Sequence, residues 1–97
     1  MAVRRFPIRG DVDLASVADI QAKLEVLLRA TGDDLVLDCD EMTFIDSTGV
    51  AMFLYAQRAL EVDGRSLRVE NLSESGRRLF DLLGLTEVLG LRELDSA

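Results

Sequence analysis

Apolar residues in this chain switch repeatedly between the spacing of a strand and the spacing of a helix, and this alternation limits the folds open to it. Leu35-Val36-Leu37 is an apolar run of strand type, within a strand expected over residues 34–39. The spacing before it predicts a helix over residues 14–31, and the spacing after it predicts a second helix over residues 47–62. Strands that alternate with helices indicate a largely parallel sheet with helices packed against it, so the expected class is α/β.

Further elements extend this pattern toward both ends of the chain. Residues 3–13 are expected to form the first strand, and Pro7 marks it as an edge because proline cannot donate a ladder hydrogen bond. A third strand is expected over residues 66–70. Ser73 is then a plausible N-cap of a third helix that buries Leu79, Leu82 and Leu83. A last short strand around residues 88–91 would give about four strands in a mostly parallel or mixed sheet.

Length and charge exclude several classes of protein. The 97 residues suffice for a single domain, expected over residues 1–97. A net charge of −7 argues against direct binding of nucleic acid, which needs a clustered basic surface. No apolar stretch approaches the roughly 20 residues of a membrane span, so a cytoplasmic protein is expected. Histidine is absent and Cys39 is the single cysteine, so neither a metal site nor a cofactor is expected.

The most informative segment reads Met-Thr-Phe-Ile-Asp-Ser-Thr-Gly-Val from Met42 to Val50. It places Ser47 where a buried strand gives way to a helix, at or next to the helix N-cap. As a cap, Ser47 would bond the free N–H groups of the first turn, whereas as an exposed hydroxyl it would be open to modification. Gly49 is equally open to two interpretations, close approach of another protein or tight packing of the helix. The residues alone leave these alternatives open.

Three segments together resemble a known family: Gly10-Asp11-Val12-Asp13, Asp46-Ser47-Thr48-Gly49, and the run from Gly76 to Leu85. They resemble the STAS domain family, in particular the bacterial anti-sigma factor antagonists. The resemblance implies that an anti-sigma factor serine kinase phosphorylates Ser47, in preference to Thr48, and that Asp13 and Asp46 line the site. It implies an antagonist that binds the kinase while Ser47 is free, releases it on phosphorylation, and is reset by a phosphatase. We find no second catalytic group, so an enzyme is not expected.

The expected partner surface surrounds Ser47. On the second helix, Val50 and Leu54 fall on the side opposite the predicted core face, so they are expected to form an exposed apolar pair. The partner-binding residues predicted around the serine are therefore Asp13, Asp46, Thr48, Gly49, Val50 and Leu54.

Two other functions and one feature of the architecture follow from the same resemblance. The alternative is a STAS subunit of a membrane transporter, of the phospholipid ABC type, that binds its ATPase constitutively. A sensory module for a small molecule or nucleotide is less favoured, because no Gly-rich phosphate loop is present.

Family members normally carry a further strand before the Gly10 segment and often a closing helix, so this chain looks minimal at both termini. One sheet edge is then expected to be open, which allows homodimerisation.

Overall fold

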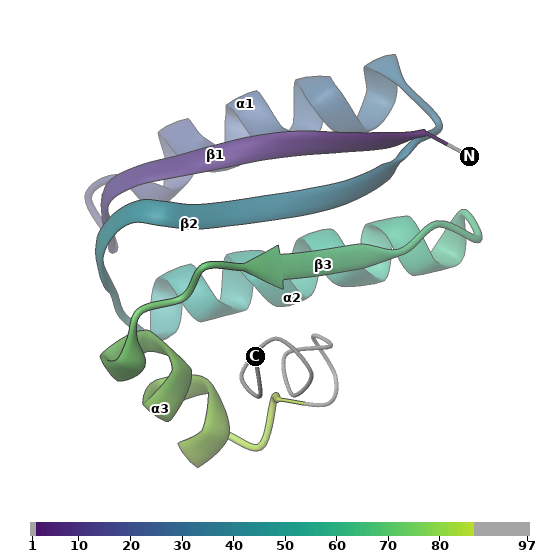
Figure 1. The fold of residues 1–97 in the computed structure, drawn as a ribbon. Coiled ribbons are helices and arrows are strands. Elements are labelled where there is room, and N and C mark those ends of the chain that lie inside the picture. The colour runs from purple at the N-terminus through teal and green to yellow at the C-terminus, as the bar shows by residue number, and fades with distance from the viewer. Residues whose placement is uncertain (1, 87–97) are drawn as a thin grey trace.

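The alternation of strands and helices is present in the computed structural model, which describes residues 2–86 (Figure 1). The elements run in the order β1 (Val3–Val12), α1 (Val17–Ala30), β2 (Asp34–Ile45), α2 (Ser47–Val62), β3 (Leu67–Glu70) and α3 (Glu74–Leu82). The three strands form one parallel sheet in the order β1-β2-β3. The predicted α/β class is confirmed. The strand expected around residues 88–91 lies outside the described residues.

Strand β1 forms one edge of the described sheet, as Pro7 predicts. The carbonyl of Ala2 accepts a hydrogen bond from the Asp34 N–H, and backbone groups of a strand alternate in direction, so the nitrogen of Pro7 faces away from β2. Strand β2 continues six residues beyond its predicted end at residue 39. It stays paired with β1 as far as Val12 and Ile45, through two shifts of register.

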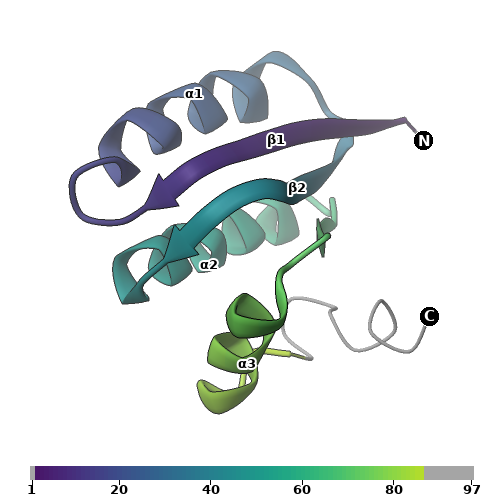
Figure 2. The ribbon, with the colours of Figure 1, turned by 60° about the vertical axis from the view of Figure 1, so that its left-hand side comes forward.

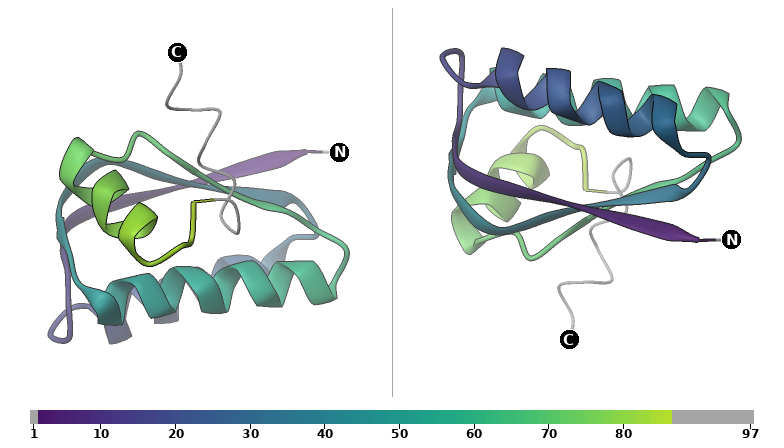
Figure 3. Two further views of the ribbon diagram at one scale, coloured as in Figure 1. Left: turned by 90° about the horizontal axis from the view of Figure 1, so that it is seen from below. Right: turned by 90° about the horizontal axis from the view of Figure 1, so that it is seen from above.

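Helices α1 and α2 lie side by side on one face of the sheet (Figure 3). Helix α3 packs beside α2, where the rings of Phe53 and Phe80 have centroids 5.6 Å apart. The core consists of alternating inward residues of the strands and the inner faces of the helices, among them Ile8, Val12, Leu24, Leu35, Leu37, Phe53, Leu60, Val69 and Phe80. Within residues 2–86, no helix is both long and apolar enough to cross a bilayer.

Helix α2 buries a wider arc than its sequence predicts. Tyr55 donates a hydrogen bond to Glu25 of α1 on one flank, while Phe53 meets α3 toward the other. Val50 is only 3% exposed and belongs to the core, and Leu54 is half-buried against it. The prediction of an exposed Val50–Leu54 pair is therefore wrong, because a helix packed on both flanks has a smaller free face than one packed only on a sheet.

Helix α3 begins as predicted but is rotated relative to the prediction. The Ser73 hydroxyl accepts a hydrogen bond from the Gly76 N–H at 3.1 Å, which confirms the N-cap. The buried residues of the helix are Gly76 and Phe80. Leu82 is 78% exposed and Leu83 48% exposed, so the expectation that these two leucines are buried is wrong.

Candidate functional site

Parallel strands bring the two motif aspartates to one end of the domain. Val12 and Ile45 are register partners at the ends of β1 and β2, and Asp13 and Asp46 follow them directly. The Asp46 N–H donates to the Val12 carbonyl at 3.2 Å, which ties the two loops together. Helices α1 and α2 both begin at this end (Figure 2). The positive ends of two helix dipoles therefore lie beside the same pair of loops.

Asp46, not Ser47, is the N-cap of α2. Its Oδ1 accepts hydrogen bonds from the Thr48 N–H at 2.9 Å and the Gly49 N–H at 3.1 Å. Ser47 is the first residue of the helix and its side chain is exposed, while Thr48 is half-buried. No hydrogen bond of the Ser47 hydroxyl is found within residues 2–86. Since the cap is supplied by its neighbour, the serine hydroxyl is free for another role.

Asp13 holds the turn that leads into α1, whose N-cap is Ser16 and has no side-chain cap hydrogen bond. Its Oδ1 accepts from the Ala15 N–H at 3.0 Å and from the Ser16 N–H at 3.2 Å. The Ser16 hydroxyl donates to the Asp11 carbonyl at 2.6 Å. In the described part of the chain neither Asp13 nor Asp46 bonds the Ser47 hydroxyl. Asp46 instead holds the turn that bears Ser47, and Asp13 holds the neighbouring turn before α1.

Gly49 is buried and fixes the position of the first turn of α2. A Cβ at this position would lie 2.7 Å from Ile45 Cγ1, 2.7 Å from Val12 Cγ1 and 2.8 Å from the Val12 carbonyl oxygen. Tight packing, one of the two interpretations that the sequence left open, is therefore a requirement here. Gly49 lets the turn that bears Ser47 sit directly on the ends of β1 and β2.

Two exposed apolar side chains lie in the loops and strand end around Ser47. Leu14, directly after Asp13, is 78% exposed, and Phe44, two residues before Asp46, is 53% exposed. Beside Phe44, a groove of about 220 Å³ runs between the end of β2 and α3, with Leu79 on its wall. Sequence reasoning missed Phe44, although a signal exists. Because strand side chains alternate and Ile45 points into the core, Phe44 must point out of it.

The hydroxyl of Ser47 is exposed and unbonded at this end of the described domain. Ser47 has no histidine to activate it, since the chain contains none. Among residues 2–86, no group of three or more acidic, cysteine or histidine side chains is placed to hold a metal ion. Burial raises the pKa of the Cys39 thiol to about 12, so this thiol is not a nucleophile at neutral pH. An exposed hydroxyl of this kind can receive a phosphoryl group that another protein transfers.

The comparisons with known proteins agree with this fold. The anti-sigma-B factor antagonist of Bacillus subtilis (strain 168) is 36% identical over 84 residues, which are 87% of this chain and 76% of that protein. The structure of the anti-sigma factor antagonist SpoIIAA in its unphosphorylated form superposes with a TM-score of 0.73 at 26% identity, over 84% of this chain and 71% of that chain.

Two further structures share the fold. The Bacillus cell fate determinant SpoIIAA in its phosphorylated form gives a TM-score of 0.68 at 25% identity, over 86% of this chain and 76% of that one. The STAS domain of a SulP transporter from Vibrio cholerae superposes with a TM-score of 0.71 at 14% identity, over 93% of this chain and 70% of that one. A similarity at this identity shows the fold alone. Residues 4–93 match the family model described as "Mlab, STAS domain". The chain therefore belongs to the STAS domain family.

Proposed function

We propose that this protein is an anti-sigma factor antagonist that is controlled by phosphorylation of Ser47. Unphosphorylated, it binds an anti-sigma factor serine kinase through the end of the domain that carries Ser47, and so frees a sigma factor. Phosphorylation by that kinase ends the binding, and a separate phosphatase restores it. The protein acts on transcription without touching nucleic acid. Support comes from the relatives named anti-sigma-B factor antagonists and from SpoIIAA, solved in both phosphorylation states.

One observation carries the proposal: Asp46 caps α2, which leaves the hydroxyl of the neighbouring Ser47 exposed and unbonded. A serine that served as the cap would be held against the backbone, and its modification would damage the helix start. Here the phosphate can be added without loss of the cap. The fold is therefore expected to survive the modification.

The phosphate changes the surface by its charge. It adds about −1.5 to −2 charges at neutral pH. The N–H groups of Thr48 and Gly49 already bond Asp46, so the phosphate stays at the surface beside the carboxylates of Asp46 and Asp13. A partner that fits this end before phosphorylation then meets a bulky, strongly negative group. The switch acts on the interface and leaves the fold intact.

The apolar part of the interface differs from the pair that the sequence indicated. Val50 is in the core and Leu54 is half-buried, whereas Phe44 and Leu14 are exposed at the Ser47 end. We assign the partner contact to these two side chains, together with the loops around Asp13, Asp46 and Thr48. Gly49 contributes by positioning the turn. Pairing of two copies through the free edge of β1 stays a prediction.

Intact-mass measurement with candidate anti-sigma factor kinases and ATP tests the phosphorylation. We expect one added phosphoryl group on the wild-type protein and on the control Thr48→Ala, and none on Ser47→Ala. Transfer to Ser47→Ala at the normal rate would refute the assignment. In a binding assay, Ser47→Ala should still bind the kinase, while the phosphorylated protein should bind more than tenfold more weakly, a loss of more than about 1.4 kcal/mol of binding free energy. The circular dichroism spectrum and the melting temperature of the phosphorylated protein should hardly differ from those of the unphosphorylated protein.

The second candidate is a transporter STAS subunit that binds its ATPase constitutively. The SulP transporter domain, at 14% identity, shows that this fold also occurs in a transporter and does not by itself favour this function. The same experiment separates the two. A stable complex with an ATPase, formed without any change in mass, would favour the transporter function.

A further inference from the structure

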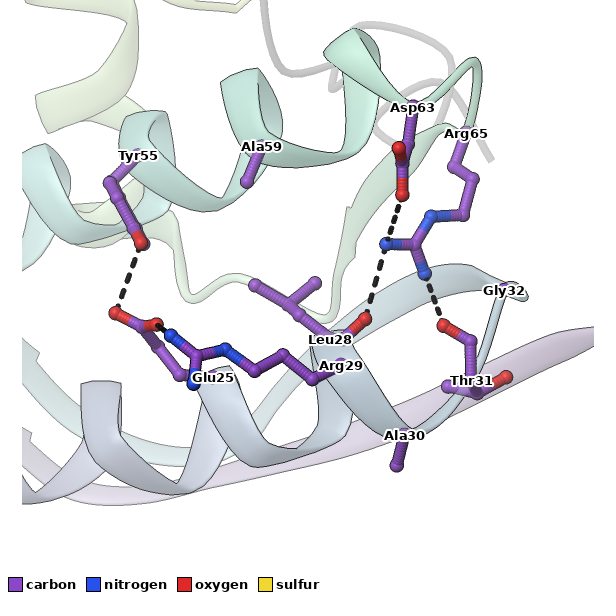
Figure 4. A pocket seen from close by; sticks show the side chains of 10 residues that line it. All are labelled: Glu25, Leu28, Arg29, Ala30, Thr31, Gly32, Tyr55, Ala59, Asp63 and Arg65. Carbon is purple, nitrogen blue, oxygen red and sulfur yellow. Dashed lines mark hydrogen bonds and ion pairs between the residues drawn. The ribbon is translucent and has the colours of Figure 1, made fainter.

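A second concave site lies at the opposite end of the domain from Ser47. A cavity of about 620 Å³ opens between the C-terminal halves of α1 and α2, beside Arg65 (Figure 4). Helix α2 has 16 residues, which at 1.5 Å per residue separate its two ends by about 24 Å. The residues of α2 that line the cavity begin at Tyr55, about 12 Å from Ser47 along the helix axis. The cavity is therefore distinct from the surface assigned to the kinase, and the inference drawn from it does not depend on that assignment.

The electrostatic character of this end is negative. Helices α1 and α2 both end here, at Ala30 and Val62, and each helix C-terminus carries about half a negative charge. The carboxylates of Glu25 and Asp63 also line the cavity. Two arginines, Arg29 and Arg65, balance them formally. How each arginine is held decides what the cavity can bind.

Arg65 is already bound by the protein. One terminal nitrogen donates to the Thr31 carbonyl at 2.6 Å, and the other donates to the Leu28 carbonyl at 3.2 Å and to Asp63 Oδ2 at 3.0 Å. Its side chain is only 9% exposed, and the remaining N–H, on Nε, is buried. The Nε–H has no hydrogen-bond partner but is buried, so Arg65 offers no exposed donor to an incoming anion. It also demonstrates that the end of α1 accommodates a guanidinium group.

Arg29 is held far more loosely. Its side chain is 83% exposed and lies 3.4 Å from Glu25 Oε1, whereas the Glu25 side chain is 30% exposed. Exposed pairs of this kind contribute little to stability, so another cation can replace Arg29 at Glu25. The other oxygen of Glu25 accepts a hydrogen bond from Tyr55 at 3.0 Å. Figure 4 shows the Tyr55 side chain pointing from α2 toward Glu25 across the mouth of the cavity.

Between these polar groups the cavity wall is aliphatic. Leu28 and Ala59 line it between Glu25 and Arg65. A ligand with an aliphatic stem can cover these two side chains while its charged head reaches Glu25. The ring of Tyr55 beside that carboxylate adds a face on which a cation is favourable. An anion in the same place would meet the Glu25 carboxylate, while Arg65 is already bound to Asp63 and to carbonyls at the end of α1.

We propose that this cavity binds a cationic group on an aliphatic stem, that is, an alkylammonium or alkylguanidinium. The head replaces Arg29 at Glu25 next to Tyr55, and the stem packs on Leu28 and Ala59. Such a group can come from a free polyamine or from a lysine or arginine side chain of another protein. The chemistry is the same in both cases, and the experiment distinguishes the two sources.

The sequence provides a convenient probe, because Tyr55 is the single tyrosine and tryptophan is absent. Tyrosine fluorescence therefore reports on this cavity, and amide shifts of the ¹⁵N-labelled full chain locate the binding. We would titrate spermidine, Nα-acetylarginine amide and inorganic phosphate. Either cation is expected to saturate the fluorescence and to shift amides of residues 25–32 and 55–65. Tighter binding of spermidine indicates a free amine, and tighter binding of the arginine amide indicates a protein side chain.

Matched variants separate a specific site from general attraction to an acidic protein. Glu25→Gln should weaken binding about tenfold, while Glu61→Gln, which removes the same charge from an exposed position outside the cavity, should weaken it less than about twofold. Arg29→Gln should tighten binding, and its control Arg58→Gln should not. Equal effects of Glu25→Gln and Glu61→Gln would overturn the proposal. So would a titration in which phosphate shifts these amides, or in which neither cation does.

Discussion

Replacement of Gly49 by alanine tests the packing that positions Ser47. Alanine is favoured over glycine in a helix by up to about 1 kcal/mol. Its Cβ would, however, lie 2.7 Å from two side-chain carbons and 2.8 Å from the Val12 carbonyl oxygen, closer than the 3.0 Å that real Cβ contacts respect. Side chains can rotate away, but the carbonyl belongs to the backbone and accepts the Asp46 N–H bond.

The expected magnitude follows from these opposing terms. Overpacking of a close-packed core costs about 1 to 3 kcal/mol, and loss of the bond between Asp46 and Val12 costs about 1 kcal/mol more. The gain in helix propensity offsets part of this cost. Gly49→Ala should therefore reduce the free energy of unfolding by about 1 to 3 kcal/mol. For a domain of this size each 1 kcal/mol lowers the melting temperature by roughly 4 to 8 °C.

Urea unfolding followed by circular dichroism measures this loss, and the chain offers two matched controls. A Cβ added at Gly32 would meet no heavy atom within 4 Å, so Gly32→Ala should be neutral or stabilising by up to about 1 kcal/mol. At Gly76 the nearest atoms are Leu72 Cδ2, which can move, and the Ser73 hydroxyl oxygen that caps α3, both at 3.3 Å, so Gly76→Ala should cost less than Gly49→Ala. A Gly49→Ala protein as stable as the wild type would refute the packing argument.

Three further predictions concern the cap, the partner surface and the cavity. In the same urea melts, Asp46→Ala should lower the free energy of unfolding by about 1 kcal/mol, and Ser47→Ala should lower it by less than about 0.5 kcal/mol. A larger loss for Ser47→Ala than for Asp46→Ala would show that the serine is the cap. Phe44→Ala should weaken kinase binding by about 1 to 2 kcal/mol, whereas Val62→Ala, 88% exposed at the far end of α2, should leave it unchanged; equal effects would place the contact elsewhere. The hydrogen bond to Glu25 raises the pKa of Tyr55, so Glu25→Gln should lower the pKa of Tyr55 in an ultraviolet titration. An unchanged pKa would contradict the contact between Tyr55 and Glu25.

The sequence was sufficient for the fold wherever a local signal and the tertiary contacts agree. Alternating periodicity predicted the parallel sheet, Pro7 the edge, and Ser73 the cap of α3. The end of β2 was missed, because polar residues after position 39 interrupt the apolar run and two shifts of register interrupt the alternation. Pairing with β1 nonetheless carries the strand on to Ile45.

The site was predictable in its position and less so in its composition. The order of strand, aspartate and helix indicated that Ser47 lies at a helix start, but not which residue is the cap, since Asp46 and Ser47 are both good N-caps. The exposure of Val50 was predicted wrongly, because α2 also contacts α3 through Phe53 and Phe80 and therefore buries a wider arc than the sequence indicates. A helical wheel of one segment holds no information on a neighbouring helix.

The parallel topology places helix dipoles of opposite sign at the two ends of this domain. Each helix that follows a strand begins at the strand's C-terminal end, so the N-termini of α1 and α2 gather beside Ser47 and their C-termini gather at the cavity. The dipoles alone favour an anion at the first end, where the carboxylates of Asp13 and Asp46 oppose one, and a cation at the second end. Tyr55, beside which the cation head is proposed to bind, follows Ser47 by about 12 Å along the axis of α2. This is about one and a half times the screening length of about 8 Å at physiological ionic strength, so a phosphate on Ser47 should change cation binding only weakly through its charge.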